Sequence, residues 1–216
     1  MGNCSFRRSG LFLVMVLAAQ MTAQSSSSPS KPESPQARIS SPSPGTVTNG
    51  IYRNTTFDFA YKIPFGWVDR TREMSEEPAG STDAKKSVLL LAVFEHPPEA
   101  AGDSVNSAVV VAAEPASSYP GLQNPEQYFG PLTTLAKSKG LTLIDEPYEF
   151  RVGTAQLVRG DFSKPLGNLT MHQSTLVVVE KGFVVSFTFI GGSEDEVDEL
   201  MEGLTFGLKS VPAAHK

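Results

Sequence analysis

The sequence has one cysteine, three histidines, and fewer basic than acidic residues, with a formal net charge of −5. Cys4 lies in an N-terminal segment that we expect to be removed, which leaves no thiol for a disulfide, a nucleophile or a metal site. Removal of Arg7 and Arg8 with that segment makes the remainder more acidic. A nucleic-acid partner is therefore not expected, because phosphates are bound through clustered lysine and arginine.

The standard catalytic and cofactor motifs are also missing. The sequence has no G-x-G-x-x-G, no phosphate loop, no H-E-x-x-H and no G-x-S-x-G. A metal site from Glu95, His96 and His172 has no ligand spacing in its favour. The acidic run at 194–196 is explained by helix capping and lacks the pattern of a calcium loop. We therefore expect no catalytic residue, no cofactor and no metal, and predict that the chain is not an enzyme.

The longest apolar run is short and lies at the N-terminus. Arg7 and Arg8 precede the run 11–19, and small residues follow it up to Ala23. This is the layout of a secretory signal, and the run has about half of the ~20 residues that a spanning helix needs. We predict cleavage after Ala23, a secreted or periplasmic location, and no transmembrane segment in the mature chain. An uncleaved anchor is the alternative.

Composition divides the rest of the chain. Residues 24–46 are rich in serine and proline and almost devoid of large apolar side chains, so they predict a disordered linker. Residues 47–211 have the length of one domain with a core of its own. Residues 212–216 are predicted to be a flexible tail.

Several strands can be predicted from apolar patterns. Alternation predicts a half-buried strand at 57–63, and continuous apolar runs predict strands covered on both faces at 87–94 and 108–113. Alternation recurs at 148–152 and in the segment beginning at Ala155. Two apolar runs flank Glu180-Lys181-Gly182, which predicts a β-hairpin.

Two helices are also predicted. Asn124, followed by Pro125, favours a helix that ends at Gly140, with a kink or break at Pro131. Ser193 and Glu196 form a capping box for a second helix. The apolar stripe of that helix comprises Val197, Leu200, Met201, Leu204 and Leu208.

The order of these elements predicts an α+β fold with a central, mainly antiparallel sheet. Antiparallel pairing follows because helices do not alternate with the strands. Strands that are apolar on both faces need cover on both sides, which two helices could supply. The expected architecture is an α/β/α sandwich.

The beginning of the domain resembles a known family. The pattern Y-x-N-x-x-F-x-F-x-Y-x-x-P-x-x-W is similar to the opening of PsbP-like domains, and it is formed by Tyr52, Asn54, Phe57, Phe59, Tyr61, Pro64 and Trp67. The end is similar too, with a strand near Ile190, a polar turn and a helix ending at 204–206. The resemblance covers roughly 50–210 and implies an α/β/α sandwich. It also implies binding or accessory work, because the family includes photosystem II extrinsic subunits, a Ran-binding import factor and bacterial envelope lipoproteins. A shared fold does not transfer a partner.

One end of the predicted sheet is a candidate partner surface. If the strands at 57–63, 87–94 and 107–113 alternate in direction, the loops 68–86 and 114–123 emerge together, and long loops are often functional. Trp67 would lie at their base, as an aromatic contact or as a plain core anchor. The candidate residues are Trp67, Arg70, Arg72, Lys85, Lys86 and Tyr119.

These observations favour an exported, non-enzymatic binding or accessory module of the cell envelope. Its expected partner is another envelope protein or a small ligand. The alternatives are a structural or adhesive envelope protein and, less favoured, a hydrolase of unrecognised type. Asn54 and Asn168 lie in N-glycosylation acceptor sequences, a pattern that often arises by chance.

Overall fold

The computed structural model describes residues 42–75, 87–100 and 104–207. The predicted signal peptide, most of the predicted linker, Lys85, Lys86 and the predicted tail lie outside these residues. The strands are β1 (Thr46–Thr48), β2 (Ile51–Asn54), β3 (Phe59–Lys62), β4 (Val68–Asp69), β5 (Val88–Phe94), β6 (Ala108–Pro115), β7 (Thr142–Leu143), β8 (Tyr148–Val152), β9 (Ala155–Leu166), β10 (Leu169–Glu180), β11 (Phe183–Gly191) and β12 (Leu204–Phe206). The helices are α1 (Thr71–Ser75), α2 (Phe129–Ser138) and α3 (Glu194–Met201), with 3-10 turns η1 (Ala116–Ser118) and η2 (Pro125–Tyr128).

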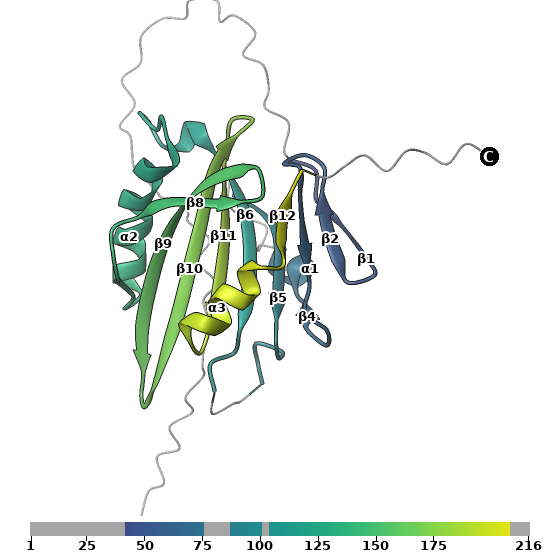
Figure 1. Ribbon diagram of the computed structural model, residues 1–216, viewed down its shortest axis with the longest axis vertical. Helices are drawn as coiled ribbons and strands as arrows, with labels where there is room; N and C mark the ends of the chain where they lie inside the picture. The colour runs from purple at the N-terminus through teal and green to yellow at the C-terminus, as the bar shows by residue number, and fades with distance from the viewer. Residues whose placement is uncertain (1–41, 76–86, 101–103, 208–216) are drawn as a thin grey trace, which may run out of the picture.

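The strands form two sheets (Figure 1). The smaller sheet has the order β1-β2-β3-β12, and the larger has the order β4-β5-β6-β11-β10-β9-β7, with β8 also paired to β9. Every strand pair in the described residues is antiparallel. The predicted α+β class with a mainly antiparallel sheet is confirmed. The structure adds a second, smaller sheet to the predicted central one.

The predicted hairpin is present and joins β10 to β11 in the larger sheet. Glu180 pairs with Phe183 across a two-residue turn, as predicted. Lys181 and Gly182 both have positive φ, at 51° and 81°. A two-residue turn with positive φ at both positions matches the right-handed twist of the strands, which is why glycine is favoured there.

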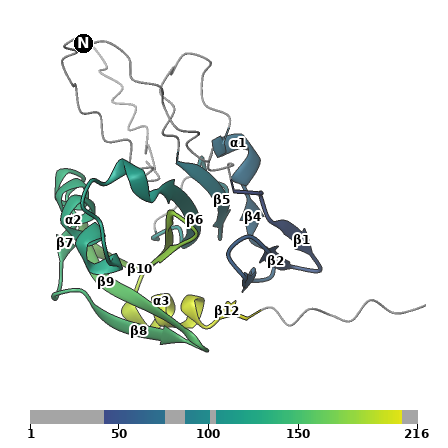
Figure 2. The ribbon, with the colours of Figure 1, turned by 90° about the horizontal axis from the view of Figure 1, so that it is seen from above.

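The larger sheet buries a different cluster on each face. On β11, Phe183, Phe187 and Phe189 belong to the core shared with the smaller sheet and α3. Val184, on the opposite face, packs into the cluster of η2 and α2, which includes Phe129. Figure 2 shows α2 and α3 on opposite sides of the sheet. The predicted cover on both faces is therefore confirmed.

The predicted helix after Asn124 is two successive helical segments. The Asn124 side chain accepts a hydrogen bond from the Gln127 backbone N–H at 3.2 Å and caps η2. Helix α2 begins at Phe129, so the interruption precedes Pro131 instead of falling at it. Pro131 lies in the first turn of α2, where a missing N–H costs no intrahelical hydrogen bond.

The predicted second helix begins as expected and ends early. The Ser193 hydroxyl accepts from the Glu196 backbone N–H at 3.2 Å, so the predicted cap is confirmed. The continuation to Leu208 was wrong, because α3 ends at Met201 and Leu204–Phe206 form β12, which pairs with β3. Gly203 permits the change of direction, because a Cβ there would lie 2.9 Å from the Tyr61 ring.

No helix among the described residues has the length and apolar character to cross a bilayer.

Gly160 provides a test of the packing between α2 and the sheet. A Cβ on Gly160 would lie 2.4 Å from Phe129 Cε1, whereas one on Gly130 would meet nothing within 4 Å. We expect G160A to lower the free energy of unfolding by about 1–3 kcal/mol through overpacking. The control G130A should be neutral or stabilising by up to about 1 kcal/mol, because alanine favours a helix. Urea denaturation measures both, and equal stability of G160A and the native chain would contradict this packing.

Candidate functional site

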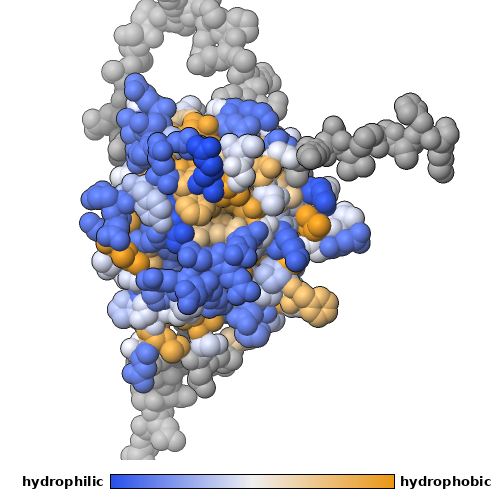
Figure 3. Space-filling model, viewed as in Figure 1, coloured by the Kyte–Doolittle hydropathy of each residue, from blue (hydrophilic) through white to orange (hydrophobic). Residues whose placement is uncertain are grey.

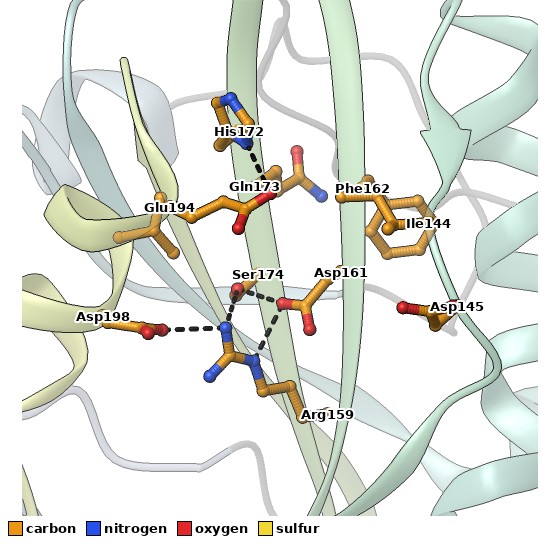
Figure 4. A pocket seen from close by; sticks show the side chains of 11 residues that line it. Ile144, Asp145, Arg159, Asp161, Phe162, His172, Gln173, Ser174, Glu194 and Asp198 are labelled. Atoms are coloured by element: carbon orange, nitrogen blue, oxygen red, sulfur yellow. Dashed lines mark hydrogen bonds and ion pairs between the residues drawn. The ribbon is translucent and has the colours of Figure 1, made fainter.

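A polar cavity of about 140 Å³ lies between α3 and strands β9 and β10 (Figure 4). Strand alternation brings Arg159 and Asp161 of β9 and His172 and Ser174 of β10 into its lining. Asp198 lines it from α3. The cavity thus brings together side chains from as far apart in the sequence as Ile144 and Asp198, which is why they show no motif.

Arg159 is the centre of the hydrogen-bond network in this cavity. Its Nε donates to Asp161 Oδ1 at 2.8 Å, and its Nη2 donates to Ser174 Oγ at 3.1 Å and to Asp198 Oδ1 at 2.8 Å. The Ser174 hydroxyl donates to the same Asp161 oxygen. The guanidinium also lies 5.3 Å from the ring centre of Phe150. Arg159 therefore fastens α3 to the sheet.

The electrostatics of Arg159 agree with this structural role. Burial acts to lower its pKa, but the hydrogen bonds and charges of Asp161 and Asp198 outweigh burial, so the pKa lies above its ordinary value. The Arg159 side chain is only 12% exposed, whereas Asp198 is 57% exposed. The charge on Arg159 is therefore permanent, and the pair that it makes with Asp161 is the better shielded from water.

The side chains of the cavity do not form a hydrolytic relay. The hydrogen bonds of Ser174 join it to Asp161 and Arg159, while His172 Nδ1 lies 3.6 Å from Glu194. In a serine–histidine relay the histidine is the direct hydrogen-bond partner of the serine, and Ser174 and His172 do not form this pair. Within residues 42–75, 87–100 and 104–207, no three histidine, cysteine or acidic side chains are grouped closely enough to hold a metal ion.

A second buried polar cluster lies at the end of β6. Glu114 is 5% exposed and accepts hydrogen bonds from the hydroxyls of Tyr119 and Tyr128, the latter at 3.1 Å. Burial raises the pKa of Glu114 more than the two hydrogen bonds lower it. Burial and the neighbouring Glu114 also raise the pKa of both tyrosines. The cluster links two parts of the chain to the sheet: the segment that follows β6, through Tyr119, and η2, through Tyr128.

The structure does not bring the predicted partner residues together. Val68 pairs with Phe94, so Trp67 and Arg70 lie at the end of β5 that is remote from Tyr119. The expectation failed for Trp67 and Arg70 because β4, and not β3, is the neighbour of β5. Val88 pairs with Ala113, so the start of β5 does lie beside the end of β6, where the loop 114–123 begins. Trp67 is half-buried against the core, Arg70 binds Glu99 at 2.8 Å, and Tyr119 is bound to Glu114. Arg72 lies exposed on α1, and Lys85 and Lys86 fall outside the described residues.

Sequence reasoning missed Phe65, the most exposed large apolar side chain among the residues that the structure describes. Its relative exposure is 106%, and it lies between β3 and β4. The Trp67 N–H donates to the Pro64 carbonyl at 3.3 Å, and Gly66 has a φ of 86°. These features define a β-turn with glycine at the position that needs positive φ. Proline and glycine on either side of an aromatic residue were the signal that could have identified it.

A second exposed apolar turn lies at the same end of the larger sheet. Leu166 and Leu169 pair across the β9–β10 turn and are 36% and 42% exposed. This turn lies beyond the pair His172–Gly191, at the end where β5 finishes beside β4. Both turns are at the lower end in Figure 1, and Figure 3 shows hydrophobic side chains there. We call Phe65, Leu166 and Leu169 the tip surface.

The two glycosylation sequences differ in exposure. Asn54 is fully buried, and its side chain donates to the Tyr52 hydroxyl at 3.1 Å and accepts from the Phe57 N–H at 3.0 Å. Asn168 is exposed in the β9–β10 turn. Only the second is accessible in the folded domain.

Glu114 predicts a pH dependence of stability. Because its pKa in the fold lies above the ordinary 4.5, the folded chain holds a proton that the unfolded chain has lost. Stability should therefore fall as pH rises from about 4.5 through the raised value. E114Q removes this loss, so its stability relative to the native chain should increase over that range. Urea denaturation from pH 4 to pH 8 measures the difference, and a difference that does not change with pH would contradict the assignment.

Comparison with known proteins gives similarity at the level of solved structures. No family model matches the chain, and no curated protein matches it. A cyanobacterial PsbP (CyanoP) from Synechocystis is 14% identical, with a TM-score of 0.46 over 76% of this chain and 98% of that one. LpqN of Mycobacterium tuberculosis, involved in cell envelope biogenesis, is 14% identical, with a TM-score of 0.36 over 68% and 82%. A protein of unknown function from Pseudomonas aeruginosa is 12% identical, with a TM-score of 0.34 over 57% and 78%.

A PsbP thus stands among the similar structures. At these identities and TM-scores, the likenesses say nothing of what the chain binds or does. The strand pairings and helices establish the fold by themselves: the chain is an α+β protein with a mainly antiparallel sheet covered on both faces, and a PsbP is among the solved structures that it resembles.

Proposed function

We propose that the chain is an exported, non-enzymatic binding module of the cell envelope. It docks on another component of the envelope through the tip surface, with Trp67 at its base. Export rests on the apolar run 11–19 and the small residues before Gln24. The docking part rests on the exposure of Phe65 in the folded domain. Export and docking can be tested separately.

The observation that carries the docking proposal is the exposure of Phe65. Every other phenylalanine in the described residues is buried or half-buried. Phe65 instead lies at the corner of a turn that is fixed by the Trp67–Pro64 hydrogen bond and by two flanking strands. A side chain held outward in this way loses little conformational freedom on binding, which favours its use as an anchor.

The two buried polar clusters support a binding role over an enzymatic one. In both clusters the polar groups bind one another and hold helices against the sheet, as the pairs Arg159–Asp198 and Glu114–Tyr128 illustrate. A catalytic acid or base has to come within hydrogen-bond reach of its substrate, whereas these groups are directed at one another.

A small-ligand function is the second candidate, and the lining of the Arg159 cavity favours it. Asp145 and Glu194 add two carboxylates to those of Asp161 and Asp198. A ligand of only a few atoms that carries a positive charge would suit the volume and the charge of this cavity. Chemical-shift changes at these residues on addition of small amines would favour this candidate over docking through the tip surface.

Photo-crosslinking in cells tests the docking proposal. A photoreactive residue replaces Phe65 in one variant and Ile144 in another, because Ile144 is 44% exposed and lies away from the tip surface. We expect adducts, to a protein or to a lipid, from position 65 and not from position 144. Adducts from neither position, or from both equally, would be evidence against docking through this surface.

A further inference from the structure

The tip surface consists of two separate convex turns. Phe65 lies beside β4, and the Leu166–Leu169 turn joins β9 to β10, so five strand spacings separate β4 from β9. At about 4.8 Å per spacing the two turns are roughly 24 Å apart, less any curvature of the sheet. The cavity beside α3 has Glu194 in its lining, and neither that cavity nor the one beside η2 is lined by Phe65, Leu166 or Leu169. The tip surface therefore presents exposed apolar side chains on two separate turns.

The strand ends between the two turns carry exposed carboxylates. The side chain of Glu95, which follows β5, is 40% exposed, and that of Glu194, after β11, is 72% exposed. A protein–protein interface has the opposite arrangement, with apolar residues at its centre and a polar rim. The two apolar turns of the tip surface lie on either side of the carboxylates of Glu95 and Glu194. This arrangement suits a partner that accepts each turn separately. A bilayer does this, because acyl chains take up the tips while charged groups remain among the headgroups.

We propose that the tip surface rests on a lipid bilayer, with Phe65 and the Leu166–Leu169 turn inserted between the headgroups. This inference rests on the proposed function and names its partner. The binding is reversible, because three side chains bury much less apolar surface than an acyl anchor combined with a second signal. The acidic chain, with a net charge of −5, and the carboxylates between the tips favour zwitterionic over anionic lipid.

Trp67 makes the inference directly measurable. It is the only tryptophan of the chain and lies two residues from Phe65. Its fluorescence therefore reports on this turn and on no other part of the protein. We expect vesicles of phosphatidylcholine to shift the Trp67 emission to shorter wavelength, and brominated phosphatidylcholine to quench it. Added salt should not weaken the effect, because insertion of apolar side chains is not screened.

Variants of the exported chain separate insertion from unspecific adsorption. F65A should weaken partition into phosphatidylcholine vesicles about tenfold, and L166S/L169S should weaken it by a similar factor. The matched control I144S changes an exposed apolar residue away from the tips and should bind as the native chain does. Phosphatidylglycerol in the vesicles should reduce binding.

Three results would overturn the inference: absence of quenching of the native chain, equal partition of F65A and the native chain, or an equal loss in I144S. Specific protein adducts from position 65 in cells, together with absence of quenching, would leave the docking proposal intact and reject the bilayer as its partner. Absence of adducts from position 65 and absence of quenching would reject both.

Discussion

Aromatic residues of β3 and of the turn before it contact β11 and join the two sheets. Phe57 meets Phe183 and Phe59 meets Phe187 edge-on, with ring centres 5.8 Å and 4.9 Å apart, and Tyr61 lies 6.1 Å from Phe189. Each such pair adds about 0.5–1.5 kcal/mol beyond the burial of its surface. Because β3 leads directly into the Pro64–Trp67 turn, these contacts also fix where Phe65 stands relative to the larger sheet.

Much of the fold could be predicted because local patterns determine it. The alternation in 183–189, the turn at Lys181-Gly182 and the Ser193 cap depend on residues close in the chain, and each is present in the structure. The end of α3 could not be predicted in this way. Leu204 continues the apolar helical spacing, yet it pairs with Tyr61, more than a hundred residues earlier. A free strand edge outweighed local helix preference there, as tertiary contacts often do.

The candidate site was less predictable than the fold, for a related physical reason. Trp67 was expected at a partner surface, and it does lie beside the tip surface, but the choice of Tyr119 depended on a strand order that places β3 next to β5. The two-residue strand β4 takes that place, and a strand so short has no periodicity to detect. Phe65 was overlooked because apolar residues are usually assigned to the core, and only the flanking Pro64 and Gly66 indicate that it points outward.

The pairing of β3 with β12 has a consequence for the order in which the chain folds. The smaller sheet is complete only when Leu204–Phe206 reach the edge of β3, and the Tyr61 hydroxyl then donates to the Leu200 carbonyl at 3.2 Å. Contacts so distant in sequence form late, because the long loop between them must close first. While the chain is being synthesised from its N-terminus, the aromatic residues of β3 therefore lack both of their permanent neighbours, β11 and β12. The smaller sheet therefore cannot close until Leu204–Phe206 have been made, and for most of its synthesis the chain carries an aromatic strand without a finished sheet around it.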